Sequence, residues 1–484
     1  MAAQAGVADR RSPRPAAVRG WPTSPDASVL IVAVPIAASI VLATAAGLRS
    51  LETVAAFAAI LVAVVSPAVG LAVLAFMATL QSPGGIPAPG FASMMVGATL
   101  VGCVYRLPLE RPRPRANAPL LLLSAFVLFV TVQQSPEMAG GYSGQQAHAV
   151  GYLFFQLLTA FGFVVAAIWL LADRSPYPAI VMGIAGASLA ALIALVPYVL
   201  PAIGAPFANL SGNSEDLTRA SGPFSNPNFM GGSMAVALAG TLALLTITRD
   251  VRIRGILICA AIAIGGAIVI TLSRGALIAA FAGVAWLALT RSRASAVALL
   301  VLGLVGAFVI YPAFVEWRLV NLTGSASSAA FEVMARSDEG RLSGVLAGLP
   351  LFLSSPIVGV GFGQYLSATV ELSAGRNAIG AHNWYIYVLG EQGLVGITLW
   401  LSVLVTYGVA LRARPSLPRS VGFPVFVAFI VASMFLELPT SFQTVALPSL
   451  LLVAALAANW PPANDYPGDD SMIASATQKR WAGT

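Results

Sequence analysis

Long apolar segments recur along almost the whole chain, and they constrain its fold more than any other feature. A helix needs about 20 apolar residues to cross a bilayer. Segments close to that length cover residues 27–47, 51–65, 67–80, 91–105, 118–133, 149–172, 178–200, 227–248, 255–272, 275–290, 295–312, 383–409, 421–437 and 446–459. The pair around Ser66-Pro67 is short enough to be one broken or re-entrant helix, and the last two segments are also short. We therefore expect about 12 to 14 transmembrane helices.

The composition supports the same fold class. Hydrophobic residues make up 58% of the 484-residue chain, charged residues make up 9%, and the mean hydropathy is +0.85. No single soluble core of this length needs so much apolar sequence. The two cysteines, Cys103 and Cys259, fall inside apolar segments and indicate core packing rather than a disulfide framework. The sequence predicts an all-α polytopic membrane protein.

The basic residues predict how the chain is oriented, because loops retained in the cytoplasm are enriched in arginine and lysine. If the N-terminus is cytoplasmic, most of the 26 basic residues fall on that side. The exceptions are Arg49, Arg219, Arg274, Arg318, Arg336, Arg341 and Arg376. We expect a plasma-membrane protein with both termini cytoplasmic, a disordered tail over 1–26 and a second tail over 460–484.

Between the tails, we expect a transmembrane bundle over 27–312, an outer loop domain over 313–382 and C-terminal transmembrane helices over 383–459. Further stretches predicted to lie outside are 134–148, 201–226 and 438–445. Within the long loop, residues 341–354 are apolar but too short to span a bilayer, which indicates an interfacial helix. A glycine-rich turn over 355–365 follows and is expected to lie over the membrane surface.

His382 stands where this outer loop meets a predicted membrane helix. Histidine exchanges protons readily near neutral pH, so this position suits proton transfer at the membrane surface. Asn383, Tyr387 and Glu391 follow at four-residue steps and form a polar stripe on the new helix. A helix-start histidine bonded to loop backbone is the alternative. The only other histidine, His148, is expected to lie on the surface.

Two arginines on the predicted outer side are candidates for binding an anion. Arg274 interrupts a long apolar run within Ser273-Arg274-Gly275, and Arg341 precedes the interfacial helix. Guanidinium groups can bind a diphosphate through paired, charge-assisted hydrogen bonds. Arg274 could instead be a snorkelling arginine at a helix end, and Arg341 a solvated loop residue.

Amides and glycines mark two further positions. Asn226 and Asn228 flank Pro227 at the start of a predicted span, where either could cap the helix or hydrogen-bond a sugar. Gly390, Gly393 and Gly396 are expected to let neighbouring helices approach closely.

Several motifs are missing from the sequence. No His, Cys and carboxylate residues have metal-ligand spacing, and the single lysine, Lys479, leaves no phosphate-binding loop for ATP. There is no Gly-x-Ser-x-Gly elbow. No acidic residue lies deep in a predicted span, which argues against ion-coupled transport. We therefore expect no metal and no cofactor.

The order of these motifs resembles that of the O-antigen ligase and polymerase superfamily, whose members transfer glycans from polyprenyl-diphosphate carriers outside the plasma membrane. The resemblance covers roughly 220–410. It rests on Asn226-Pro227-Asn228, Ser273-Arg274-Gly275, Gly340-Arg341, Pro356-Ile357-Val358-Gly359-Val360-Gly361, His382-Asn383 and Glu391-x-Gly393-x-x-Gly396.

The resemblance implies a GT-C-like, metal-independent, inverting glycosyltransferase. Arg274 and Arg341 would hold the diphosphate and His382 would act near the acceptor hydroxyl, with Asn383, Tyr387, Asn226, Asn228 and Glu391 as candidate substrate contacts. The expected partners are an undecaprenyl-diphosphate-linked glycan, a glycan or lipid acceptor and membrane lipids, without nucleic acid. Ligase and polymerase remain open, and a transporter or flippase of lipid-linked glycans is the alternative from another class.

Overall fold

The computed structural model describes residues 24–80, 90–106, 117–139, 144–172, 174–199, 219–291, 342–372, 380–414, 416–436 and 441–457. Every regular element in these ranges is helical. Six helices there are long and apolar enough to cross a membrane, and further apolar helices are shorter. The predicted all-α polytopic membrane fold is confirmed. The predicted span over 295–312, Arg341 and most of both predicted tails lie outside the described residues.

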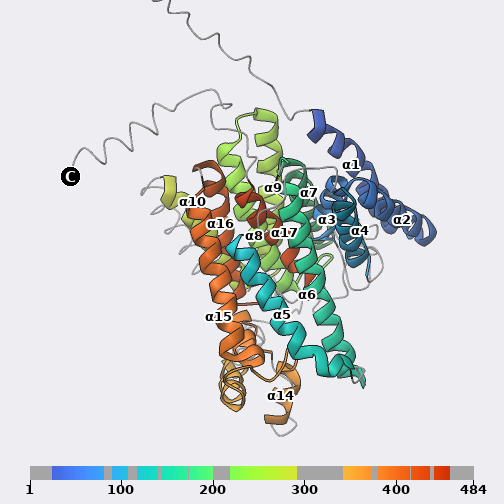
Figure 1. The fold of residues 1–484 in the computed structure, drawn as a ribbon. Coiled ribbons are helices and arrows are strands. Elements are labelled where there is room, and N and C mark those ends of the chain that lie inside the picture. The colour runs from blue at the N-terminus through green and yellow to red at the C-terminus, as the bar shows by residue number, and fades with distance from the viewer. Residues whose placement is uncertain are drawn as a thin grey trace, which may run out of the picture.

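The helices begin and end close to the predicted segments. They are α1 (Ser24–Ala45), α2 (Arg49–Val65), α3 (Pro67–Met77), α4 (Phe91–Arg106), α5 (Ala118–Ala139), α6 (Gly144–Leu171), α7 (Tyr177–Val199), α8 (Pro227–Ile247), α9 (Val251–Ile270), α10 (Arg274–Arg291), α14 (Tyr365–Leu372), α15 (Trp384–Arg412), α16 (Ser416–Ser433) and α17 (Phe442–Leu456) (Figure 1). A short apolar helix covers Leu342–Ser354, within the segment predicted as an interfacial helix.

The break at Ser66-Pro67 separates two antiparallel helices. A Cβ atom built on Gly70 would lie 2.7 Å from the Cβ of Ala63, whereas seven residues of a straight helix rise about 10 Å. Proline at the first position of α3 has no N–H to donate to the preceding turn, so the chain can reverse there. The two short segments are therefore the arms of a helical hairpin.

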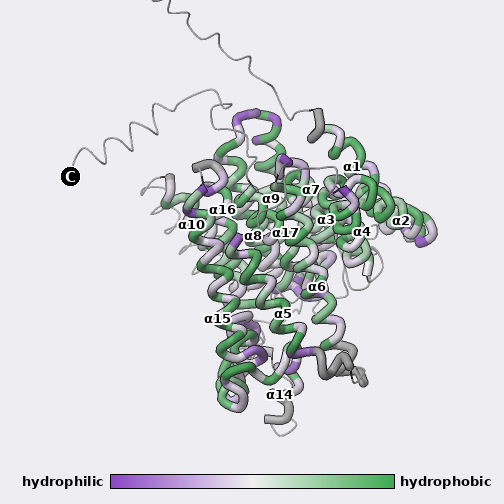
Figure 2. The backbone as a smooth tube through the Cα atoms, viewed as in Figure 1, coloured by the Kyte–Doolittle hydropathy of each residue, from purple (hydrophilic) through white to green (hydrophobic). Residues whose placement is uncertain are grey.

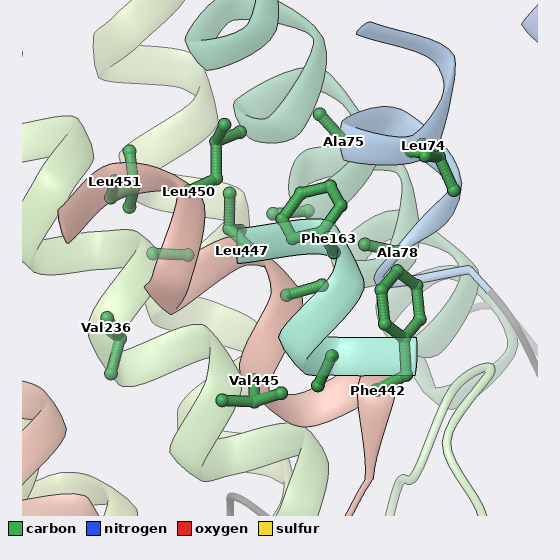
Figure 3. Close-up of a cluster of buried hydrophobic side chains, with 14 of the residues drawn as sticks. Leu74, Ala75, Ala78, Phe163, Val236, Phe442, Val445, Leu447, Leu450 and Leu451 are labelled. Carbon is green, nitrogen blue, oxygen red and sulfur yellow. The ribbon is translucent and has the colours of Figure 1, made fainter. Parts of the chain in front are cut away.

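The short C-terminal helix α17 lies in the middle of the bundle. Figure 3 shows its Phe442, Val445, Leu447, Leu450 and Leu451 among side chains of α3, α6 and α8. All five are at most 7% exposed, and Phe442 packs edge-on against Phe163 with ring centroids 5.5 Å apart. Such burial of apolar surface fixes the surrounding helices relative to one another.

The two ends of the bundle differ in charge. One end, which we call the arginine-rich end, includes the α8–α9 and α15–α16 connections and the adjoining helix ends. It carries Arg249, Arg252, Arg254, Arg412, Arg414 and Arg419. These connections lie at the top of the view, where Figure 2 shows hydrophilic residues. The opposite end, which we call the site end, carries α14 below the bundle (Figure 1). The predicted site residues that the structure describes lie towards the site end.

Candidate active site at the site end of the bundle

The helix after His382 is broken and folds back on itself, so it is not the single straight span predicted over 383–409. Gly393 has φ 63° and ψ −158°, which no helical residue adopts. The rings of Trp384 and Trp400 lie 5.6 Å apart, although a straight helix would separate residues 16 positions apart by about 24 Å. Residues 384–392 therefore run towards a tip at Gly393, and residues 394–412 return across the bundle.

The reversal moves His382 inward. The prediction placed His382 at the membrane surface, where a span begins. Because residues 384–392 lie alongside the start of 394–412, the chain before Trp384 instead lies level with Trp400, within the bundle. Glycine was recognised at position 393, but as a packing residue. Its positive φ, which favours glycine, is what permits the turn.

The glycine-rich turn over 355–364 wraps around the tip of this hairpin and completes its hydrogen bonds. The N–H groups of Val360 and Gly361 donate to the carbonyls of Gly390 and Glu391, at 3.1 and 2.9 Å. In return, Leu394 N–H donates to the Pro356 carbonyl and Val395 N–H to the Ile357 carbonyl. The turn thus provides hydrogen-bond partners for the backbone N–H and carbonyl groups that lose their helical partners at the break. The two motifs form one interlocked unit, although a surface turn was predicted.

Helix α5 holds this unit in place from the side. The amide of Gln133 donates to the carbonyls of Val358 and Glu391, at 2.7 and 2.9 Å, and the amide of Gln134 donates to the Phe362 carbonyl at 2.8 Å. Gln134 is fully buried. These contacts join residues more than 200 positions apart, so no local sequence signal marks them.

Substituting Gly359 tests this interlock. Gly359 has φ +76°, and a Cβ there would overlap the backbone of Glu391. We expect Gly359→Ala to lower the thermal unfolding temperature and to remove most activity, because backbone cannot move aside as a flexible side chain can. Gly265→Ala is the matched control, since its Cβ would meet nothing within 4 Å. Equal unfolding temperatures for the two variants would contradict the interlock.

Two members of the predicted polar stripe face the outer-loop helices. The Glu391 carboxylate is 3% exposed and accepts hydrogen bonds from Tyr365 N–H, at 2.9 Å, and from the Gln392 amide. Tyr387 stacks on Tyr365 with ring centroids 4.4 Å apart. Asn383 accepts from the N–H groups of Tyr385 and Ile386 as the helix N-cap. The structure thus gives Glu391 a positioning contact with α14.

Tyr365 also contacts both the predicted interfacial helix and the irregular segment that carries His382. Its hydroxyl donates to the Gly344 carbonyl at 2.6 Å, and its side chain is fully buried with Leu351 and Ala381. Gly344 packs so closely on Gly380 that a Cβ would overlap the Gly380 carbonyl. The first turn of the helix Leu342–Ser354 therefore lies against the residues just before His382.

The backbone at His382 is itself unusual. His382 has φ 47°, and Leu272 has φ 52°; among the described residues these are the only positive φ values outside glycine. Left-handed conformations of non-glycine residues are uncommon, and they cluster at functional sites. Leu272 lies two residues before Arg274. A backbone conformation that the surrounding structure must hold in place therefore occurs within one predicted motif and directly before the other.

A second cluster surrounds the turn between α9 and α10. Arg274 is the first residue of α10 and is partly buried. Arg219 donates from Nε to the Thr271 carbonyl at 2.8 Å and from its terminal nitrogen to Oδ1 of Asn228. Asn226 caps α8 by accepting from the Asn228 N–H at 2.8 Å. Arg219 was predicted only to be one of the outer arginines, without this role.

Helix α16 connects the two clusters. Gly275 packs on Phe435 just after α16, where a Cβ would lie 2.5 Å from the Phe435 Cβ. The Tyr385 hydroxyl donates to the Ile430 carbonyl on the same helix at 3.3 Å. Five helical residues rise about 7.5 Å, so the turn before Arg274 and the segment after His382 both contact the last turns of α16.

The comparison with protein families covers this region. A sequence model of the family described as Wzy_C, O-antigen ligase, matches residues 258–401. Residues 258–401 of the chain are thus similar to the O-antigen ligase family. The match confirms the resemblance to the O-antigen ligase and polymerase superfamily and supports a function of that type. The matched region includes Arg274, the glycine-rich turn, His382 and the hairpin tip, whereas Arg219, Asn226 and Asn228 precede it. No curated protein matches the chain.

The remaining predicted residues are placed as follows. Arg341 lies outside the described residues, although the helix that follows it is described. Cys103 is buried in the core, as predicted, while Cys259 is exposed on α9. Within the described part of the chain, no three His, Cys, Asp or Glu residues come together as a metal site.

Proposed function

We propose that this protein transfers a glycan from an undecaprenyl-diphosphate carrier to an acceptor hydroxyl on the outer face of the plasma membrane. The observation that carries this proposal is where the two left-handed non-glycine residues of the described chain lie: His382 is in one motif suited to this chemistry, and Leu272 directly precedes the Ser273-Arg274-Gly275 motif. The family match supports glycosyltransferase activity in general. Transfer by the purified protein from a lipid-linked oligosaccharide tests the proposal.

The chemistry needs only a base and charge stabilisation, because a sugar on a diphosphate is already activated. The acceptor oxygen attacks the anomeric carbon as its proton passes to the His382 imidazole. The bond from that carbon to the diphosphate oxygen breaks, and the diphosphate leaves with the electron pair. Arg274 stabilises the negative charge on the leaving group. Attack from the face opposite the diphosphate inverts the anomeric configuration, and no metal is required.

Arg341 is proposed as the second diphosphate ligand. It directly precedes the helix Leu342–Ser354, whose Gly344 packs against Gly380 and Ala381. Two guanidinium groups would suit the charge of a diphosphate.

The proposed orientation puts the arginine-rich end in the cytoplasm. Positively charged connections are retained there during membrane insertion. Arg249 lies in such a connection, and Arg252, Arg254 and Arg412 lie in the helix turns next to one. The site end would then face outward, where the lipid-linked donor and the acceptor meet.

Arg219 is proposed as a positioning residue for the turn that presents Arg274. Its two hydrogen bonds join Thr271 in the turn to Asn228 on α8. We expect Arg219→Gln to lower kcat about tenfold with little change in the donor KM, because the loss of these hydrogen bonds displaces the turn rather than removing a donor contact. Arg254→Gln, an exposed arginine of the opposite end, is the control. A rise in KM alone would show that Arg219 binds the donor directly.

A further inference from the structure

A large cavity within the bundle is not used by the proposed reaction. Its volume is about 620 Å³, and it lies between α5, α6, α15, α16 and α17. Most of its lining is aliphatic or aromatic, including Leu123, Phe161, Val403 and Phe429. None of its lining residues, all of which belong to the described ranges, is acidic. The cavity therefore suits a hydrocarbon chain far better than a sugar.

The charged residue of the lining lies at the arginine-rich end of the cavity, whereas Ser449 and the Trp400 indole N–H lie farther along it. Arg414 and Asn117 line it there, close to the ends of α15 and α17. Arg414 is partly buried, and its guanidinium has no hydrogen-bond or ion-pair partner among the described residues. Asn117 caps α5 with its side-chain oxygen, which accepts from Leu120 N–H at 3.0 Å, so its NH₂ group can donate elsewhere. An unpaired guanidinium beside an apolar cavity favours an anionic ligand.

The length of the cavity matches one leaflet of a bilayer. Along α15 it extends from Trp400 to beyond Arg412, because Arg414 lines its end. The 12 residues between Trp400 and Arg412 rise about 18 Å, and half of a hydrocarbon core is about 15 Å thick. A phosphate at Arg414 would thus place its acyl chain along the lining towards Trp400.

From this charge and length complementarity, we infer that the cavity binds an anionic phospholipid of the leaflet at the arginine-rich end. Its phosphate lies on Arg414, and one acyl chain fills the cavity. Trp400, which the chain reaches, contacts Trp384 and Phe126 with ring centroids 5.6 Å apart in each pair. The lipid would therefore support the aromatic residues behind the segment that follows His382. This inference does not depend on the proposed reaction.

Native mass spectrometry of the full-length protein tests this site. The protein in detergent is titrated with phosphatidylglycerol or phosphatidylcholine carrying the same acyl chains. We expect wild type to retain phosphatidylglycerol preferentially, and Arg414→Gln to reduce that preference about tenfold or more, as expected for loss of a charge-assisted hydrogen bond. Arg412→Gln, an exposed arginine that does not line the cavity, is the matched control and should keep the preference.

A second measurement tests the position of the lipid's acyl chain rather than that of its head group. Ala160 lines the cavity, so Ala160→Phe should fill it and lower binding of both lipids. Phosphatidylglycerol with dibrominated acyl chains should quench tryptophan fluorescence in wild type, and less so in Trp400→Phe. Equal retention of the two lipids by wild type, or equal effects of Arg414→Gln and Arg412→Gln, would overturn the inference. Quenching that is unchanged in Trp400→Phe would also overturn it.

Discussion

Replacing His382 by glutamine is expected to lower glycan transfer by about 10²–10⁴-fold while donor binding persists, because general-base catalysis typically contributes that much. The backbone at this residue complicates the test, since φ is 47°. Asparagine tolerates the left-handed region about as well as histidine does, but its amide cannot accept a proton near neutral pH. His382→Asn therefore separates the loss of the imidazole from a change of backbone conformation.

The other histidine of the chain provides the matched control. His148→Gln should keep transfer close to the wild-type rate. Near-normal activity in either His382 variant would refute the assignment of the base. If only His382→Asn were near normal, the loss in His382→Gln would come from the changed backbone conformation. Thermal unfolding of each variant, measured in the same detergent, establishes that the compared proteins are folded.

Removing the guanidinium at Arg274 is expected to cost about 10²–10³-fold in kcat, the range found when a group that stabilises developing charge is removed. Arg274→Lys should recover part of this loss, because an ammonium keeps the charge without the paired geometry of a guanidinium. The measurement is release of polyprenyl diphosphate at saturating donor. Lysine keeps an aliphatic stem of similar length to the one that an arginine at a membrane boundary can bury, so it also controls for lost packing.

A different result would distinguish the snorkelling alternative. If Arg274→Gln changed thermal stability but left the rate per folded molecule unchanged, Arg274 would stabilise the start of α10 without taking part in the reaction. Arg254→Gln at the arginine-rich end should change neither quantity, since this exposed arginine lies at the opposite end of the bundle.

The helices were predictable from the sequence because hydropathy alone decides where a chain can cross a bilayer. The start of α8 at Pro227 and the separation of α2 from α3 at Ser66 were both anticipated from proline positions. The reversal at Gly393 was not, because apolar residues continue on both sides of it. Only the contact between Trp384 and Trp400 reveals that one apolar segment forms two antiparallel helices.

The candidate site was predictable in its motifs but not in its contacts. Sequence order showed that the glycine-rich turn precedes His382, yet not that its N–H groups complete the broken helix at Gly390 and Glu391. Arg219 offered no local signal, because its partners Thr271 and Asn228 belong to other segments. Such hydrogen bonds arise from tertiary packing between segments remote in the sequence, which neither periodicity nor spacing reports.

The proposed activity of the protein is transfer of a glycan from a polyprenyl diphosphate to an acceptor. The most direct measurement incubates the purified protein, in detergent and with EDTA, with a polyprenyl-diphosphate-linked oligosaccharide and a panel of acceptors. We expect release of polyprenyl diphosphate together with a glycosylated product, and the acceptor consumed distinguishes a ligase from a polymerase. Binding of the lipid-linked glycan without any product, across all acceptors, would contradict the account and indicate a carrier-binding transporter.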